Sequence, residues 1–548
     1  MLRVESGGIN WSLGSSRDQL ERDILPDFLR RQRWFAGKAR KLETVRLART
    51  TPPGALPGSL VFSVVEAAFA DGGRDRYLLP LSVSSGADAN RLAGDPRWCV
   101  ARLEAPDGPA LLHDALADPA ACQAVLSWLS STREVQAGDA LIRGVTTDAF
   151  STVRGPTTTP LPVKVSSAEQ SNSAVIFGDR LILKLFRRLE PGLNPDFEIG
   201  RYLTEQTAFD RIPQTAGAIE LVEPGQQPTT LAILQGLVPN QGTGWEHALN
   251  QLNDYYARAR SAADPAPEDD RAPLVLANEP IPASATSTLG PAIRDAETLG
   301  RRTAELHLAL GSETPNSAFQ PQPYSKDQYA SLAHDVREQV ERSLQTLQEN
   351  LDRLSGVTLD EALRVLDHSG NLLAQLDELT HRSPQVDAIR VHGDYHLGQV
   401  LRVQDDYVLL DFEGEPARPL AKRLEKQLPI KDVVGMLRSF DYAAYAGLFA
   451  ATQGDPEAAS SLAPWARAWR LWTSVAFLKA YLDKARDARF LPQRDEDLHL
   501  LLSVFTIDKS LYELLYEMNN RPDWVRIPLQ GVLAILDERD AAPGSEPR

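Results

Sequence analysis

Residues 389–399 read IRVHGDYHLGQ, and residues 411–415 read DFEGE. Each of these polar loops adjoins a short apolar run of the kind that forms a β-strand. Loops at the ends of adjacent strands bring their side chains together. The pattern therefore predicts that Asp394, Gln399 and Asp411 lie in one site.

The order of these residues matches the kinase motifs H-x-D-x-x-x-x-N and D-F-G. In that pattern Asp394 accepts the proton of the substrate hydroxyl, and Asp411 holds Mg²⁺. Gln399, five positions after Asp394, stands where Asn usually supplies an amide oxygen, and Glu413 replaces the glycine of D-F-G. Phosphoryl transfer requires positioning and charge neutralisation more than covalent chemistry. The two segments therefore predict a centre that uses ATP and Mg²⁺.

A kinase also needs a cation on the α- and β-phosphates of ATP, usually a strand lysine paired with a helix acid. Lys184 lies in the apolar run LILKLF at residues 181–186, where an unpaired ammonium group facing a core would be costly. Glu198 follows on the next predicted helix, so we expect it to support Lys184. The alternative is an edge-strand lysine that points to water.

The glycine-rich loop of protein kinases is replaced by EQSNSA at residues 169–174, which argues against a protein kinase. We expect Ser171 and Ser173 to help cover the phosphates. Residues 231–238, LAILQGLV, occupy the place of the hinge that offers backbone groups to adenine. The expected adenine contacts are Gln235, Leu237 and Val238, although the run also fits an ordinary buried strand.

The chain divides into three predicted domains. Residues 1–155 are rich in β-like runs between Pro and Gly breaks, after a first helix at 18–31. Residues 156–241 continue with strand periodicity, and residues 242–548 are dominated by helical periodicity. The predicted helices of this last part are 291–310, 326–354, 359–379, 431–447, 464–485 and 496–518.

Three local patterns give sharper predictions. Residues 174–186 read as a hairpin whose two-residue loop, Gly178-Asp179, is able to adopt positive φ. Asn194 is an N-cap, because Pro and acidic residues follow it in the first turn of a helix to about residue 205. Residues 262–290 lack a core-forming pattern and predict an extended surface insertion or mobile loop.

The composition excludes several classes of protein. The 548 residues carry a net charge of −16, which is unsuited to gripping a phosphate backbone, so nucleic acid is not an expected partner. Two cysteines cannot build a disulfide framework. No signal peptide and no run of about 20 apolar residues is apparent, so we expect no membrane association and a cytoplasmic location.

Several segments closely resemble bacterial maltokinases. The central matches are residues 391–399, 411–416 and 431–443. Near the N-terminus, residues 31–38 (RQRWFAGK) look like the opening of the maltokinase cap domain. Residues 508–524 look like the last helix and tail of that family. The similarity thus touches both ends and the centre of the chain.

The resemblance implies an α+β fold: a bilobal, aminoglycoside-phosphotransferase-like kinase with a mixed N-lobe sheet, a helical C-lobe and an N-terminal cap. It implies ATP- and Mg²⁺-dependent phosphorylation of maltose at the C1 hydroxyl, giving maltose 1-phosphate for α-glucan (glycogen) synthesis. Carried onto matching positions, Glu413 adds charge at the metal beside Gln399 and Asp411. The residues expected to bind the sugar are His396, Arg438, Lys509 and Tyr512.

Other interpretations stay open at this point, because only the resemblance selects maltose. A kinase of the same architecture can act on another acceptor, such as glucosamine or an aminoglycoside. A weakly active module that docks on trehalose synthase or a glucan-synthesis enzyme is a further possibility. Arg438 has a competing role as well, since its helix places Asp441 within reach of an ion pair.

Overall fold

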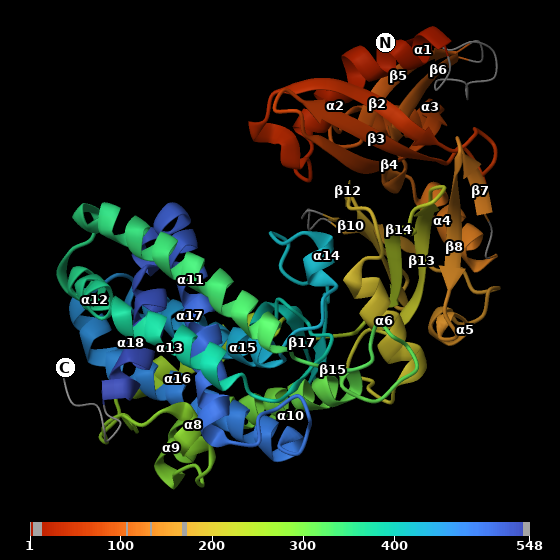
Figure 1. Ribbon diagram of the computed structural model, residues 1–548. Coiled ribbons are helices and arrows are strands. Elements are labelled where there is room, and N and C mark those ends of the chain that lie inside the picture. Colours follow the sequence, from red (N-terminus) through yellow and green to blue (C-terminus); the bar gives the residue numbers. More distant parts are fainter. Residues whose placement is uncertain (1, 4–13, 106–107, 132–133, 167–171, 541–548) are drawn as a thin grey trace. The chain divides into compact units, whose positions relative to one another are not determined.

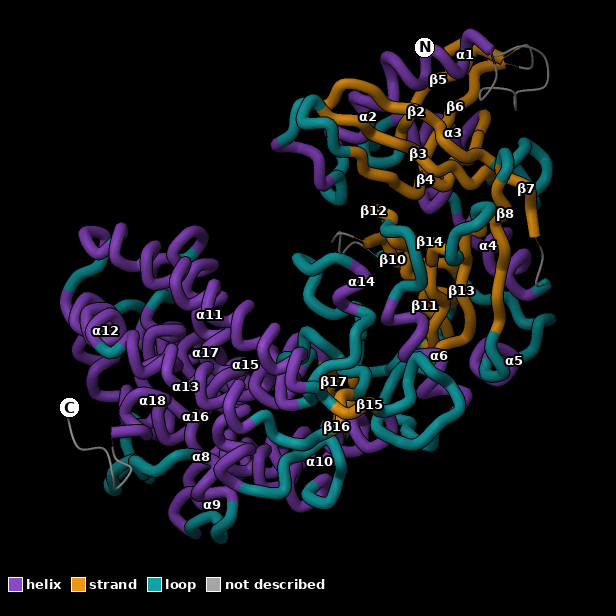
Figure 2. The backbone as a smooth tube through the Cα atoms, viewed as in Figure 1, coloured by secondary structure: helices purple, strands orange, loops and turns teal. Residues whose placement is uncertain are grey.

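A computed structural model describes residues 2–3, 14–105, 108–131, 134–166 and 172–540. The chain forms two compact units, residues 1–239 and residues 240–548. Strands are concentrated in the first unit and helices in the second (Figures 1 and 2). Among the described residues, no helix combines the length and apolarity needed to cross a bilayer.

The first unit contains two seven-stranded sheets, and the first sheet has the order β1-β5-β6-β4-β3-β2 with β12 paired to β4. Its only parallel pair among the described strands is β1 with β5. The expected helix at 18–31 is present and begins earlier, as α1, a π-helical turn and α2. The bounds are β1 (Leu2–Arg3), α1 (Gly14–Gln19), the π-helical turn (Leu20–Ile24), α2 (Leu25–Arg31), β2 (Leu42–Thr50), β3 (Val61–Phe69), β4 (Arg74–Ser85), α3 (Gly86–Ala93), β5 (Cys99–Ala105), β6 (Gly108–Asp114) and β12 (Arg188–Leu189).

The second sheet has the order β7-β8-β13-β14-β11-β10-β9. The strands of this sheet and the helices of the same region are α4 (Pro119–Ser130), β7 (Glu134–Ala137), β8 (Ala140–Thr146), α5 (Phe150–Arg154), β9 (Val163–Val165), β10 (Asn172–Phe177), β11 (Leu181–Phe186), α6 (Pro195–Gln206), β13 (Thr215–Val222) and β14 (Thr229–Gly236).

Two details of this second sheet differ from the expectations. All of its pairings are antiparallel, where a mixed sheet was expected. Strands β7 and β8 belong to it although they precede residue 155, because β8 pairs with β13 much later in the chain, with Leu141 opposite Val222. A local sequence pattern does not reveal a pairing at that separation.

The predicted hairpin and the helix that follows it are confirmed. Strands β10 and β11 pair from Asn172 opposite Phe186 to Phe177 opposite Leu181, so the loop has three residues rather than two. Within that loop only Gly178 has a positive φ, of 60°. Helix α6 begins at Pro195, and the Asn194 side chain accepts a hydrogen bond from the backbone of Asp196 as its N-cap.

The two sheets of the first unit share one apolar core. Phe62 of the first sheet, Trp128 of α4 and Phe177 of the second sheet are all buried in the same cluster. A buried ion pair joins Arg187, directly after β11, to Asp114, at the end of β6, at 2.7 Å. The two sheets are therefore packed as one body.

The second unit is a helical assembly with one hairpin, β17–β18. Its elements are α7 (Gly244–Ala259), α8 (Pro273–Ala277), α9 (Ala283–Leu289), α10 (Pro291–Leu310), β15 (Gln322–Pro323), α11 (Lys326–Glu349), α12 (Gly356–Asp367), α13 (Ser369–Arg382), β16 (Asp387–Ala388), β17 (Val400–Val403), β18 (Asp406–Leu409), α14 (Leu420–Arg423), α15 (Ile430–Thr452), α16 (Pro456–Ala485), α17 (Asp495–Asn520) and α18 (Arg526–Asp540). The region expected as one helix at 359–379 is two helices, which are divided at His368.

The segment 262–290 is not the extended or mobile loop that its composition suggested. It contains α8 and α9, which pack against α16. The indole of Trp472 on α16 donates a hydrogen bond to the carbonyl of Pro267 at 2.6 Å. Short apolar stretches such as Leu274 and Leu276 are buried there, and they are too brief to show helical periodicity in the sequence.

Candidate active site

The loop that carries Asp394 is fixed by a buried carboxylate from the first turn of α15. Asp432 accepts hydrogen bonds from the backbone N–H of His392 at 2.7 Å and of Gly393 at 2.8 Å. His307 on α10 contacts the same carboxylate, with Nε2 3.1 Å from Oδ2. Gly393 has φ +85°, a conformation that favours glycine. The loop therefore has one defined course, which presents Asp394.

The carboxyl pKa of Asp432 reflects these contacts. Burial by itself raises the pKa, but the hydrogen bond from His307 and the nearby histidines and amides lower it below its ordinary value. Asp432 is therefore ionised at neutral pH and serves as an acceptor for the loop. Asp432 was not among the predicted site residues, because its only local signal is an acidic residue in the first turn of a helix.

We expect Asp432→Asn to cost about 1–3 kcal/mol of unfolding free energy at pH 7, because buried donors lose their acceptor. The pKa of Asp432 is lowered in the folded state, so its stabilisation is present above the ordinary carboxyl pKa of about 3.9 and is lost as pH falls through the folded pKa. Urea unfolding between pH 3 and pH 8 measures this, with the exposed Asp360→Asn as control. A difference between wild type and variant that is constant with pH would contradict it.

The loop that carries Asp411 lies against the loop that carries Asp394. The Gln399 amide donates to Asp411 Oδ2 at 3.1 Å, and His392 Nε2 lies 2.7 Å from the carbonyl oxygen of Leu410. The His392 ring packs on Phe412, with ring centroids 4.9 Å apart. The structure thus brings Gln399 and Asp411 together, as the spacing of the two motifs predicted.

Asp411 adopts a left-handed backbone conformation, with φ +66°. This conformation is strained for a non-glycine residue and is retained where the surroundings impose it, often at functional sites. Carboxylate oxygens of Asp411 and Glu413 lie within 4.8 Å of each other. Together with the amide of Gln399 they form a set of hard oxygen donors, which fits Mg²⁺.

A cation lies next to Asp394. Lys509 Nζ on α17 is 3.9 Å from Asp394 Oδ1 and 3.7 Å from Glu415 Oε1. Burial by itself lowers the pKa of Lys509, but Glu415 and Asp394 raise it above its ordinary value. Lys509 is therefore charged at neutral pH. Glu415 also contacts Lys431 at 3.6 Å, and these two residues were not among the predicted site residues.

The four predicted sugar-binding residues have different surroundings. Tyr512 is 45% exposed and its ring lies 5.5 Å from Lys509 Nζ. His396 Nδ1 accepts the backbone N–H of Gly398 at 3.0 Å, inside the loop that carries Asp394. Lys509 and His396 thus lie in or beside the loop of Asp394.

Arg438, the fourth, is buried in an ionic network. Its guanidinium contacts Asp441 at 2.6 Å and Glu513 at 2.7 Å, so the ion pair considered as its competing role is present. It also forms part of the wall of a cavity of about 900 Å³ that is lined by residues 268–275 and by segments of α15, α16, α17 and α18. The role of Arg438 in sugar binding stays a prediction.

In the first unit, Lys184 lies on β11 with its Nζ 3.6 Å from Asp196 Oδ2. The carboxylate that the structure pairs with it is thus Asp196, two residues before the predicted Glu198. Two residues on a helix are about 200° apart, so the two acids lie on opposite faces of α6. Asp196 is buried and Glu198 is half-buried.

The remaining predicted nucleotide contacts also lie in the first unit. Ser173 Oγ accepts a hydrogen bond from Arg187 Nε at 2.8 Å, and Ser171 is outside the described residues. Gln235 lies near the end of β14, and Leu237 and Val238 follow that strand. The backbone N–H of Leu237 donates to the carbonyl of Arg180 at 2.7 Å, so it is engaged within the first unit.

The fold is that of kinase-like proteins with an added N-terminal domain. A solved structure of a glucosamine kinase with glucosamine, ADP and inorganic phosphate matches 92% of this chain and 96% of its own, with TM-score 0.60 and 21% identity. A second glucosamine kinase structure, crystal form A, matches 96% and 99%, with TM-score 0.62 and 20% identity. These likenesses confirm the expected α+β kinase-like architecture.

Sequence comparisons find one matching domain model and two similar proteins. Residues 28–118 match the family model of the Maltokinase N-terminal cap domain, which confirms the resemblance stated for residues 31–38. Glucosamine kinase of Streptacidiphilus jiangxiensis is 28% identical over 375 residues, covering 68% of this chain and 73% of that protein. Glucosamine kinase of Mycolicibacterium smegmatis is 26% identical over 374 residues, covering 68% and 79%.

Proposed function

We propose that the protein transfers the γ-phosphoryl group of ATP to a sugar hydroxyl. The observation that carries this proposal is the approach of Gln399 to Asp411, at 3.1 Å, beside the defined loop of Asp394. Asp394 accepts the proton of the attacking hydroxyl. Gln399, Asp411 and Glu413 hold Mg²⁺, which when bound neutralises charge on the phosphates.

The cation expected on the nucleotide is Lys184. Lys184 binds the α- and β-phosphates, and Asp196 orients its ammonium group from the first turn of α6. Ser173 and the segment after β14 supply further nucleotide contacts. We expect the protein to act in the cytoplasm, where ATP and Mg²⁺ are available.

For the acceptor we propose maltose, phosphorylated at its C1 hydroxyl to maltose 1-phosphate, a precursor for α-glucan synthesis. The cap-domain match supports this choice, as does the resemblance to maltokinases of residues 391–399, 411–416, 431–443 and 508–524. Tyr512 and Tyr516, which are 45% and 48% exposed, lie one turn apart on α17 beyond Lys509. An exposed aromatic row with a nearby donor suits an acceptor of more than one sugar ring.

Glucosamine is the second candidate, because the two relatives that align over two thirds of the chain are glucosamine kinases. The carboxylates of Asp394 and Glu415, which flank Lys509, are also of the kind that accepts the ammonium group of an aminosugar.

The proposal is tested by ADP release with ATP and Mg²⁺ against maltose, glucose, glucosamine, trehalose and an aminoglycoside. Phosphorylation at C1 converts the hemiacetal of maltose into a glycosyl phosphate, so a reducing-sugar assay falls in step with ADP release. Phosphorylation at any other hydroxyl leaves the reducing end intact. The two assays together identify both the acceptor and the position of transfer.

Each result has a distinct meaning. Turnover on maltose with loss of reducing ends supports the proposal. Turnover on glucosamine alone overturns the acceptor and retains the phosphotransferase. ATP binding without turnover on any sugar overturns both, and favours a module that docks on trehalose synthase or a glucan enzyme, which co-purification would then test.

We expect Tyr512→Ala to raise the KM for maltose about fivefold, because removing an aromatic platform costs about 1 kcal/mol. The kcat should change less than twofold, since Tyr512 does not contact the reacting atoms in this proposal. Steady-state kinetics measure the split, with Phe449→Ala as the control because Phe449 is an exposed aromatic residue on α15. An unchanged KM would remove Tyr512 from the acceptor site.

A further inference from the structure

The hairpin β17–β18 carries the candidate metal ligands at its two ends. Gln399 directly precedes β17, and Asp411 follows β18 by two residues. The backbone N–H of Leu410 donates to the carbonyl of Gln399 at 2.9 Å, which closes the hairpin at that end. Any shift of the hairpin therefore moves both ligands.

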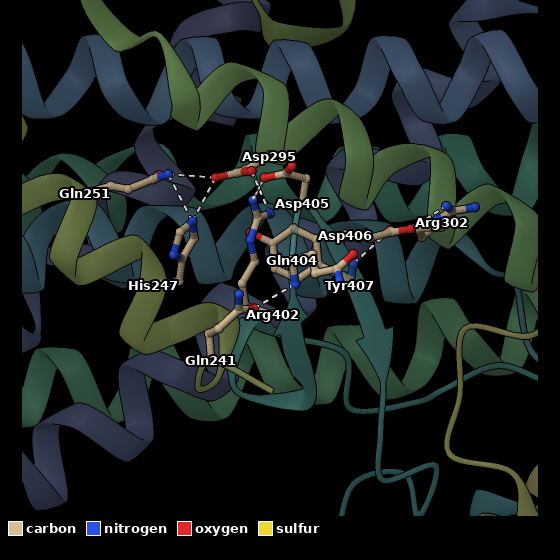
Figure 3. Close-up of polar contacts among 10 residues, drawn as sticks. All are labelled: Gln241, His247, Gln251, Asp295, Arg302, Arg402, Gln404, Asp405, Asp406 and Tyr407. Atoms are coloured by element: carbon tan, nitrogen blue, oxygen red, sulfur yellow. Dashed lines mark hydrogen bonds and ion pairs between the residues drawn. The ribbon is translucent and has the colours of Figure 1, made fainter. Parts of the chain in front are cut away.

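Two ion pairs attach the other end of this hairpin to α10 (Figure 3). Arg402 contacts Asp295 at 2.7 Å, and Arg302 binds both carboxylate oxygens of Asp406, at 2.9 and 2.5 Å. Asp295 and Arg302 are seven residues apart, about two helical turns, so they project from one face of α10. The helix thus contacts both strands of the hairpin.

The hairpin and α10 carry complementary charges, so that each positive side chain of one element faces a negative side chain of the other. The hairpin presents Arg402 and Asp406, and the helix presents Asp295 and Arg302. A reversed placement would set Asp opposite Asp and Arg opposite Arg, which is repulsive. Like-charge repulsion against wrong placements is a general source of specificity. The two pairs therefore select one position of the hairpin on α10.

Asp295 is also held from α7. His247 Nε2 lies 2.9 Å from Asp295 Oδ2, and the Gln251 amide donates to the same oxygen at 2.6 Å (Figure 3). Burial raises the pKa of Asp295, but the hydrogen bond from His247 and the charge of Arg402 lower it below its ordinary value. Asp295 is therefore ionised at neutral pH, and both of its carboxylate oxygens have hydrogen-bond partners.

The start of the second unit pairs with the same hairpin. The N–H of Gln241 donates to the carbonyl of Arg402, and the N–H of Arg402 donates to the carbonyl of Gly242, both at 2.9 Å. The Gln241 side chain accepts the N–H of Gln404 at 2.7 Å (Figure 3). Arg402 is thus fixed through its backbone by residues 241–242 and through its side chain by Asp295.

We propose that Asp295 and Arg402 are positioning residues for the metal-binding pair Gln399 and Asp411. They touch neither substrate nor metal, and they act by fixing the hairpin that carries both ligands. A largely buried ion pair such as this one is costly to desolvate, and such pairs serve to fix a single arrangement in some proteins. The proposal rests on the phosphotransferase function proposed above.

The test measures divalent-cation binding separately from turnover. Mn²⁺ is titrated into the full chain with ADP and followed by electron paramagnetic resonance, for wild type, Asp295→Asn, Arg402→Gln and Arg402→Lys. Residues that hold metal ligands in place typically contribute 10- to 100-fold in metal affinity. We expect Asp295→Asn and Arg402→Gln to weaken Mn²⁺ binding at least tenfold, and Arg402→Lys to recover part of that loss.

A matched control separates positioning from general destabilisation. Glu361 pairs with Arg526 at 3.0 Å and joins α12 to α18 in the same unit. Glu361→Gln should lower the unfolding temperature without changing the affinity for Mn²⁺. Equal Mn²⁺ affinity in wild type, Asp295→Asn and Arg402→Gln would overturn the positioning role. Wild type that binds no Mn²⁺ with ADP would instead contradict the proposed phosphotransferase.

Discussion

Asp394→Asn is expected to lower kcat with the preferred sugar by about 10²–10⁴-fold, the usual contribution of a general base. The amide has the size of the carboxylate but does not accept the hydroxyl proton. Lys509 keeps Glu415 as an ionic partner at 3.7 Å, so the fold should be retained. Steady-state ADP release measures the effect.

Two further measurements make this expectation specific. The affinity for ADP, from calorimetric titration, should be unchanged in Asp394→Asn, and the unfolding temperature should stay close to that of wild type. The exposed Asp360→Asn should retain full activity. If Asp394→Asn retained more than a tenth of the wild-type kcat, Asp394 would not be the base, and another acceptor of the proton would have to be found.

The second large effect is expected at the buried pair between Arg187 and Asp114, whose side chains are 1% and 2% exposed. Arg187 also donates to Ser173 and lies over the Trp34 ring at 5.0 Å. Asp114→Asn leaves a buried guanidinium without its counter-charge, which costs about 3–5 kcal/mol. Urea unfolding followed by tryptophan fluorescence measures this loss.

The double variant Asp114→Asn with Arg187→Met is the informative control. It removes both charges, so it should recover much of the stability that the single variant loses. Glu279→Gln, in an exposed pair with Arg271, should cost less than about 1 kcal/mol. A cost for Asp114→Asn as small as that for Glu279→Gln would show that the buried pair does not stabilise the first unit.

The sequence motifs predicted which residues of the second unit meet. Spacing alone was enough for Gln399 and Asp411, because short loops next to strand ends have few possible courses. Asp432 and Asp295 were not predicted. Each acts on residues tens of positions away, and helical periodicity does not report a partner at that distance.

The first unit shows the same limit of local patterns. The helix start at Asn194 and the strand of Lys184 were predicted, because capping and alternation are local properties. The contact of Lys184 with Asp196 was not predicted, because it depends on which face of α6 packs against the sheet, and the support expected from Glu198 stays a prediction. Strands β7 and β8 were likewise grouped with their sequence neighbours.

The shared core of the first unit bears on how this architecture is inherited. The cap match ends at residue 118, yet Phe62 within it packs in one cluster with Trp128 and Phe177 beyond it. A lineage that gained or lost the cap would have to replace this apolar surface of the second sheet in the same event. We therefore expect the core residues of the cap and of the second sheet to have evolved together.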